Sequence, residues 1–191
     1  MTCRARVAWL ALALAATAPA AGAASLTLGD REQAEALRAG ERSVTDDAFG
    51  DEWRVVSGSG ESVTVLTLFH RLALTARVAA FRNEPVKLQE RQRVLRELRE
   101  RLMLTVHLHG AREDFARHLR PRLLVADREI PPTLIQNEQT AVRREDGRFM
   151  ARCDYWFPTK ELSGTSRLTL VVGDPNGKPV ARFPIDLAKM R

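Results

Sequence analysis

The stretch Met103-Leu-Thr-Val-His-Leu-His-Gly110 decides the fold, because its apolar side chains fall at every second position. Residues two apart point to the same face of a β-strand, so this spacing indicates a strand with one face on a core. The core face comprises Leu102, Leu104, Val106 and Leu108, and the other face comprises Met103, Thr105, His107 and His109. We therefore expect a half-buried strand that ends at Gly110, with both histidines on its outward face.

The chain beyond Gly110 has the pattern of further strands. Residues 119–126 and 129–135 are separated by a tight turn at Asp127-Arg128, and alternating runs follow at 148–157 and 166–172. Asp174-Pro-Asn-Gly177 predicts a hairpin turn, since proline presets φ at the second position and glycine accepts a positive φ. The last strand contains Pro184, which has no N–H group to donate, so we expect this strand at a sheet edge.

The residues before the strand at 102–109 are patterned mainly as helices. A first helix begins at Asp30, which is spaced from Gln33 as in a capping box, and stops at Gly40. We expect this helix to be peripheral, with a connection that contains a short strand at 53–56 and a Gly-Ser turn at 57–60. Apolar residues three and four apart then predict helices over 62–83 and 86–101, separated near Pro85.

Helices grouped ahead of strands, without βαβ alternation, indicate an α+β fold rather than a parallel sheet. We predict an antiparallel β-sandwich over residues 102–188, preceded by two or three helices. The chain is long enough for one well-buried core, so residues 61–191 are expected to form a single globular domain. Residues 24–60 then supply an N-terminal helix and a connecting segment.

A family resemblance bears on the same region. It runs from the strand at 102–109 through Gly110-Ala-Arg-Glu-Asp-Phe-Ala116 to Gly173-Asp-Pro-Asn-Gly-Lys-Pro-Val-Ala-Arg-Phe-Pro-Ile-Asp-Leu-Ala-Lys-Met-Arg191. Over this region the sequence resembles uncharacterised exported bacterial proteins thought to carry an immunoglobulin-like sandwich. The resemblance implies an architecture and no activity, and the chain lacks the Cys…Trp…Cys framework of antibody domains.

Residues 1–23 have the three parts of a secretory signal peptide. Arg4 and Arg6 form the basic start, an apolar run extends from Val7 to Ala16, and small residues lead to Ala23. We expect cleavage after Ala23 and a periplasmic or secreted protein. Loss of the two arginines from 30 basic residues leaves 28 against 24 acidic ones, a net charge of +4. Cys153 is then a lone cysteine, which excludes an intramolecular disulfide.

The helix expected at 86–101 is rich in arginine. Glutamates are interleaved, and Glu97 is spaced to pair with Arg101, Arg93 with Glu97, and Arg96 with Glu100. This pattern favours a solvated face crossed by salt bridges. Electrostatic attachment of the same helix to an anionic membrane is the alternative, and it predicts liposome binding that disappears at high salt.

The pair His107 and His109 is the candidate metal site. Two imidazoles on one strand face, with Cα atoms about 6.6 Å apart, can both reach one metal ion. A stable site needs a further ligand, and the chain offers His70, His118, Cys153 and Asp154 without diagnostic spacing. Imidazole ligands favour zinc, copper or nickel. A solvated outer face without metal is the simpler interpretation.

Catalytic motifs are absent from the sequence. Cys153 alternates in step with Phe149, Tyr155 and Phe157, which favours a buried, unreactive thiol over a nucleophile. The sequence contains no Gly-x-Ser-x-Gly, His-Glu-x-x-His or Cys-x-x-Cys motif. We therefore name no catalytic residue and expect no organic cofactor.

The sequence thus predicts an exported, non-enzymatic binding or structural module of the bacterial cell envelope. Its expected partner is an envelope protein or polymer and not a nucleic acid, because an exported chain of modest positive charge meets envelope components. The alternative is a periplasmic metal-binding protein that uses His107 and His109.

Overall fold

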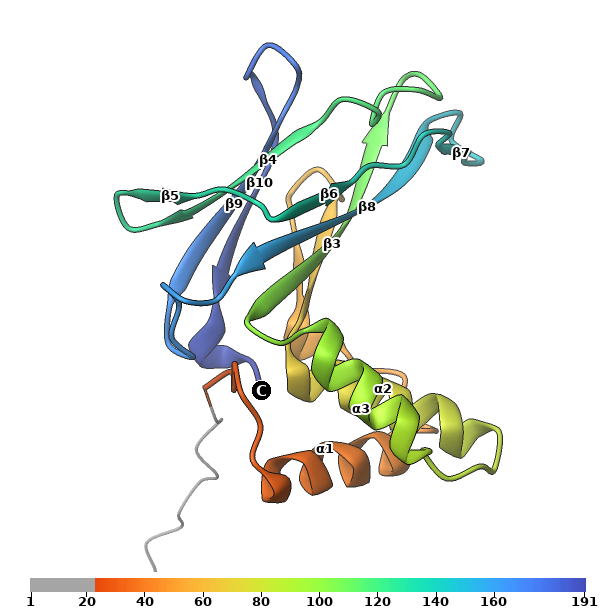
Figure 1. Cartoon of the computed structure of the whole chain (residues 1–191). Helices are drawn as coiled ribbons and strands as arrows, with labels where there is room; N and C mark the ends of the chain where they lie inside the picture. The colour runs from red at the N-terminus through yellow and green to blue at the C-terminus, as the bar shows by residue number, and fades with distance from the viewer. Residues whose placement is uncertain (1–22) are drawn as a thin grey trace, which may run out of the picture.

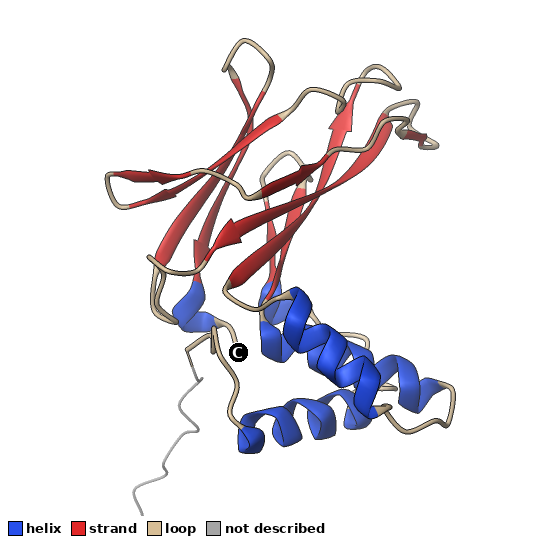
Figure 2. Cartoon of the chain, in the orientation of Figure 1, coloured by secondary structure: helices blue, strands red, loops and turns tan. Residues whose placement is uncertain are grey.

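The computed structural model of the protein describes residues 23–191 (Figure 1). Within this range the chain forms three α-helices and ten β-strands in two antiparallel sheets, which confirms the predicted α+β class. Figure 2 shows the helices gathered at one end of the sheets. The predicted leader lies outside the described residues, apart from Ala23 at its cleavage site.

The larger sheet has six strands in the order β1-β2-β3-β8-β6, with β7 also paired to β8. Its centre is the long pair β3 (Arg101–Gly110) and β8 (Phe149–Pro158), which places Val106 opposite Cys153 and His107 opposite Arg152. The shorter strands are β1 (Arg54–Val56), β2 (Ser62–Leu66), β6 (Leu134–Gln136) and β7 (Val142–Arg143). The predicted strand at 102–109 is therefore confirmed.

The smaller sheet has four strands in the order β10-β9-β4-β5. They are β4 (Arg120–Val125), β5 (Arg128–Ile130), β9 (Arg167–Gly173) and β10 (Pro179–Asp186). The hairpin turn between β9 and β10 is confirmed: the N–H of Gly177 donates to the carbonyl of Asp174 at 3.0 Å, and Gly177 has φ +84°. The edge position of β10, predicted from Pro184, is confirmed as well.

The two sheets share one hydrophobic core. The predicted core face of β3 is confirmed, because Leu102 is 1% exposed and the other three residues are fully buried. Buried side chains of the smaller sheet belong to the same cluster. The principal contributors are Leu104, Val106, Leu108, Tyr155 and Phe157 from the larger sheet, and Leu123, Leu170, Val172, Phe183 and Ile185 from the smaller sheet.

The first helix, α1 (Asp30–Arg42), differs from its prediction in three ways. Its N-cap is Gly29, whose N–H donates to Glu32, so the capping residues lie one position earlier than expected. The helix does not stop at Gly40. A Cβ there would overlap the carbonyl oxygen of Ala73, so this glycine permits close contact with α2 (Leu68–Phe81). The helix is therefore packed and not peripheral.

The predicted helix over 62–83 is wrong at its start. Residues 62–66 form β2, where Val63 and Val65 are fully buried on the core side. Helix α2 starts only at Leu68, because Thr67 caps it by accepting a hydrogen bond from the N–H of His70 at 3.1 Å. Two β-branched valines at a spacing of two thus favoured a strand over the helical spacing read from Val65 onward.

The predicted helix over 86–101 is shorter in the structure. It is α3 (Leu88–Glu97), and the chain turns through Glu100 at φ +57° before β3 begins. Val94 and Leu98 are buried, whereas Leu88 at the start of the helix is 66% exposed. Arg91 links this helix to α1 by donating to the side chain of Gln33. Among residues 23–191 no helix combines the length and the apolar character needed to cross a membrane.

Candidate functional site

His107 and His109 lie on the outward face of β3, as the sequence predicted. Both are half-buried, while Leu108 between them points into the core. Across the sheet, His107 faces Ser62 of β2 and Arg152 of β8, and His109 faces Met150. The pair is therefore embedded among the side chains of neighbouring strands, on a sheet face away from the core.

The surroundings of His107 favour a neutral imidazole. Partial burial, followed by the positive charges of Arg152 and Arg54, lowers the pKa of His107 below its ordinary value. The Nδ1 atom of His109 is buried and has no hydrogen-bond partner in the described part of the chain. A neutral imidazole nitrogen is the form that binds metal or accepts a hydrogen bond from a ligand.

The four possible further ligands do not complete a metal site. His70 packs in the helical region, His118 is exposed in the loop before β4, and Cys153 points into the core. Asp154 does lie on the face of the histidines, but it accepts a hydrogen bond from Thr105 at 2.6 Å and pairs with Arg152 at 3.4 Å. Residues 23–191 contain no group of three or more His, Cys, Asp or Glu side chains arranged to hold a metal.

A cavity of about 560 Å³ lies beside His109. Residues 143–146, which begin at the end of β7 and carry two arginines and two carboxylates, line the rest of it. His109 therefore borders the cavity among charges of both signs, whereas His107 does not line it. The cavity offers a polar ligand cationic and anionic contacts beside His109.

Cys153 is buried, as predicted. Its side chain is fully inaccessible, and burial raises the pKa of the thiol above its ordinary value. A thiol that resists ionisation is a poor nucleophile, so the structure gives Cys153 a packing role beside Tyr155. The hydroxyl of Tyr155 donates to the side chain of Asn137 at 3.0 Å, which ties the loop after β6 to β8.

The outward face around the histidines is rich in apolar and aromatic side chains. Register places Met103, Met150, Arg152 and Trp156 on this face with the pair, and the three residues other than Arg152 are half-buried. Val56 on β1, Leu134 on β6 and Val142 on β7 are 58%, 50% and 62% exposed at its margins. Figure 1 shows the helices at the end of this sheet, so they leave the face open to a partner.

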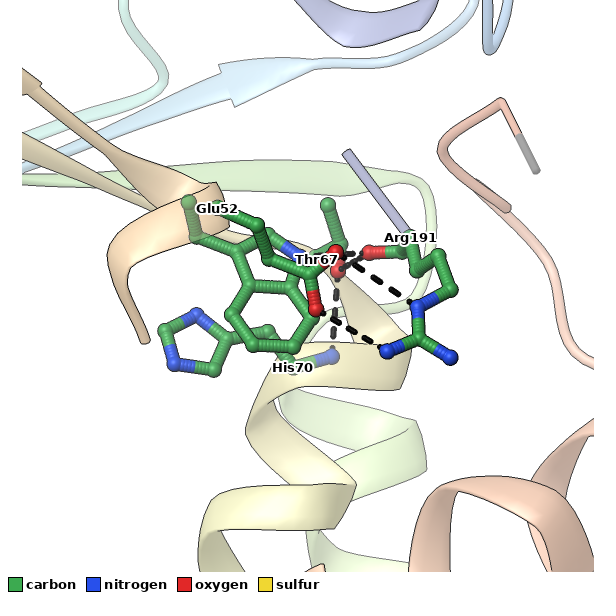
Figure 3. A network of polar contacts seen from close by, with 5 residues as sticks. Glu52, Thr67, His70 and Arg191 are labelled. Carbon is green, nitrogen blue, oxygen red and sulfur yellow. Dashed lines mark hydrogen bonds and ion pairs between the residues drawn. The ribbon is translucent and has the colours of Figure 1, made fainter. Parts of the chain in front are cut away.

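A second cluster, which sequence reasoning missed, joins the end of the described chain to the helices. Trp53 donates from Nε1 to the main-chain oxygen of Arg191 at 2.6 Å, and the hydroxyl of Thr67 donates to the same oxygen at 2.7 Å. The side chain of Arg191 donates to Glu52 at 3.2 Å (Figure 3). Trp53 and Arg191 are 138 residues apart, so no local pattern could have revealed the contact.

His70 completes this cluster beneath the tryptophan. Its ring stacks on Trp53 with centroids 4.1 Å apart and planes 4° from parallel, and its Nδ1 lies 3.1 Å from the carbonyl oxygen of Val65. Burial lowers the pKa of His70 to about 4, so the imidazole is neutral at pH 7 and Nδ1 carries the donated proton. The role of the cluster is structural, because it holds the final residues and η1 (Asp51–Trp53) against α2.

Comparisons with known proteins give no functional assignment. No family model matches the chain, and no curated protein matches it. Among solved structures, one similar chain is a protein of Burkholderia pseudomallei K96243 that is described as a novel protein of unknown function. The two are 14% identical with a TM-score of 0.42, over 85% of this chain and 92% of that one.

Proposed function

We propose that this chain is an exported, non-enzymatic binding module of the bacterial cell envelope, and that it contacts a partner protein through the outward face of the larger sheet. The observation that carries the proposal is the composition of that face. Trp156, Met103, Met150 and Arg152 are of the residue types enriched at protein interfaces, and three exposed apolar side chains extend the surface toward both edges of the sheet.

The export part of the proposal rests on residues 1–23 and on the position of Ala24. Ala24 is 3% exposed, and its N–H donates to the carbonyl of Leu187 at 3.0 Å. Cleavage after Ala23 therefore releases a chain whose first residue is already packed. The architecture we propose is an immunoglobulin-like sandwich, supported by two antiparallel sheets with a common core.

Site-specific photocrosslinking in cells tests the proposed partner surface. A photoreactive amino acid placed at Leu134 should give a discrete crosslinked protein in the envelope fraction, since this residue lies on the proposed contact face. The matched control is Val180 on β10, which is 46% exposed but belongs to the other sheet. Equal crosslinking from both positions, or none from Leu134, contradicts the proposal. The mass of the processed chain in the same fraction tests cleavage after Ala23.

A second candidate function is metal binding at His107 and His109. The observation that favours it is the buried Nδ1 of His109, which has no partner among the residues that the structure describes. Purified protein without a histidine tag should bind about one equivalent of zinc, copper or nickel and melt at a higher temperature with the metal. The double variant His107→Ala, His109→Ala should lose both effects, while His118→Ala keeps them. A melting temperature that no metal changes rules this function out.

A further inference from the structure

The turn between α2 and α3 presents large apolar side chains to solvent. Phe81, the last residue of α2, is 76% exposed, and Leu88, the first residue of α3, is 66% exposed. Val78, one turn before Phe81, is 45% exposed. Figure 1 shows this turn at the end of the helices that lies farthest from the sheets. The tip of the molecule is thus apolar, although isolated from the core.

The net positive charge of the protein is concentrated in residues 68–101, which contain α2, α3 and the turn between them. Residues 68–101 contain nine arginines and lysines against four glutamates, a net charge of +5. The rest of residues 24–191 contains 19 basic and 20 acidic residues, a net charge of −1. The excess of positive charge in residues 24–191 therefore lies in the segment that contains the apolar tip, and Arg82, Lys87, Arg91 and Arg93 are its basic residues closest to the turn, beside Glu84 and Glu90.

The basic side chains nearest the turn are available to a partner, whereas Arg77 donates to the carbonyl of Asp46 and Arg91 donates to the side chain of Gln33. Of the three helical ion pairs predicted from the sequence, the described residues form only Arg93–Glu97, at 3.9 Å with both side chains at least half exposed. Arg82 and Lys87, on either side of the turn, are exposed and make no ion pair within residues 23–191.

A groove that could hold a ligand lies between α2 and α3. It has a volume of about 280 Å³, and Leu74 and Val78 contribute apolar side chains to its lining. Arg71, Arg82 and Arg93 line it as well, together with Glu84 and Glu90. The three guanidinium groups outnumber the two carboxylates, and beside apolar side chains they suit a ligand that joins a phosphate to a hydrocarbon chain.

We propose that the α2–α3 tip docks on the surface of a bilayer that contains anionic phospholipid. Phe81 and Leu88 insert among the acyl chains close to the headgroups, and the arginines of the groove, with Lys87, hold lipid phosphates. A bilayer is the occupant because a projecting tip that combines exposed apolar side chains with the exposed basic residues Arg82 and Lys87 matches an anionic interface in both properties. This surface is separate from the sheet face proposed above as the protein-binding site.

Vesicle cosedimentation of the processed chain tests the proposal. Binding should be strong to phosphatidylcholine vesicles with about 30 mol% phosphatidylglycerol and weak to phosphatidylcholine alone, and about 0.5 M salt should remove it. Phe81→Ser with Leu88→Ser should weaken binding about tenfold or more, since both side chains lose their insertion. Val180→Ser, which removes an exposed apolar side chain from β10, should leave binding unchanged. Equal binding to neutral vesicles, or none to either, overturns the proposal.

A charge-matched pair of variants separates local contact from net charge. Arg82→Ser with Lys87→Ser should lower the affinity about 25-fold, at roughly fivefold for each basic residue near an anionic surface. Lys178→Ser with Arg182→Ser removes the same charge from the β9–β10 hairpin and should have a far smaller effect. If both pairs weaken binding equally, or if the tip binds an acidic polypeptide but no vesicle, lipid docking is wrong. In a Phe81→Trp variant, quenching by brominated lipid should report insertion directly.

Discussion

The stacked pair of Trp53 and His70 predicts a specific dependence of stability on pH. Burial lowers the pKa of His70 from an ordinary value of 6.5 to about 4 in the folded chain. Because the unfolded chain takes up this proton more readily, the contribution of His70 is fully present above the unfolded pKa and is lost as the pH falls toward the folded one. The loss amounts to about 2 kcal/mol between about pH 7 and about pH 5.

The variant His70→Phe isolates this effect. It preserves an aromatic ring beneath Trp53 but leaves the carbonyl of Val65 without its partner, which costs about 1–3 kcal/mol at every pH. Acidification should therefore destabilise the wild-type chain by about 2 kcal/mol more than the variant, so that their free energies of unfolding converge near pH 5. Carboxylate titration affects both chains and cancels in the difference.

Urea unfolding followed by far-ultraviolet circular dichroism at a series of pH values measures both quantities. The control is His118→Phe, which replaces an exposed histidine and should follow the wild-type pH dependence. Parallel stability curves for the wild type and His70→Phe would refute the reasoning, because they would mean that His70 is protonated as easily in the folded chain as in the unfolded one.

Three further predictions concern packing. Gly40→Ala should lower the free energy of unfolding by about 1–3 kcal/mol, because the added Cβ meets the backbone of Ala73 and this outweighs the better helix propensity of alanine. Thermal unfolding measures the change, and a more stable variant would contradict the close contact between the helices. Thr67→Val should lower the free energy of unfolding by about 1–2 kcal/mol, since it removes a helix cap and a hydrogen bond to Arg191. An unchanged midpoint of urea unfolding would argue against both contacts. Native Cys153 should react with a thiol reagent far more slowly than in urea, and equal rates would show that the thiol is accessible.

The sequence predicted those elements whose signals are local. The alternation around Val106, the turn at Gly177 and the edge position of Pro184 each depend on a spacing or a backbone constraint that acts within a few residues. These predictions agree with the structure because one face of each strand is buried and a register shift would expose it.

The errors arose where distant contacts override a local pattern. Gly40 was expected to end a helix, but the approach of α2, more than 30 residues later, explains why the helix passes through it. Val63 and Val65 join a strand because β3 lies alongside them. The sequence offered His70 only as a possible further metal ligand, but Trp53, brought over it by η1, covers its ring. Such contacts depend on the tertiary fold and produce no periodic pattern of residue types in the sequence.

The sequence could not predict the surroundings of His107 and His109, because these also depend on contacts between distant residues. Alternation placed His107 and His109 on the outward face, but it carries no information on which side chains lie across the sheet. The register with β8 supplies Arg152 beside His107, and a positive charge disfavours a bound cation there. The buried Nδ1 of His109 is the feature of the pair that has no hydrogen-bond partner among the described residues.

The two prolines of β10 have a consequence for self-association. A strand at the edge of a sheet can add a strand from another copy of the chain, and repeated addition leads to aggregates. Pro179 and Pro184 remove two backbone donors from β10, and Arg182 between them adds an exposed charge. At the opposite edge, β5 offers only three residues. Both borders of the smaller sheet are therefore poor templates for the addition of a strand from another copy of the chain.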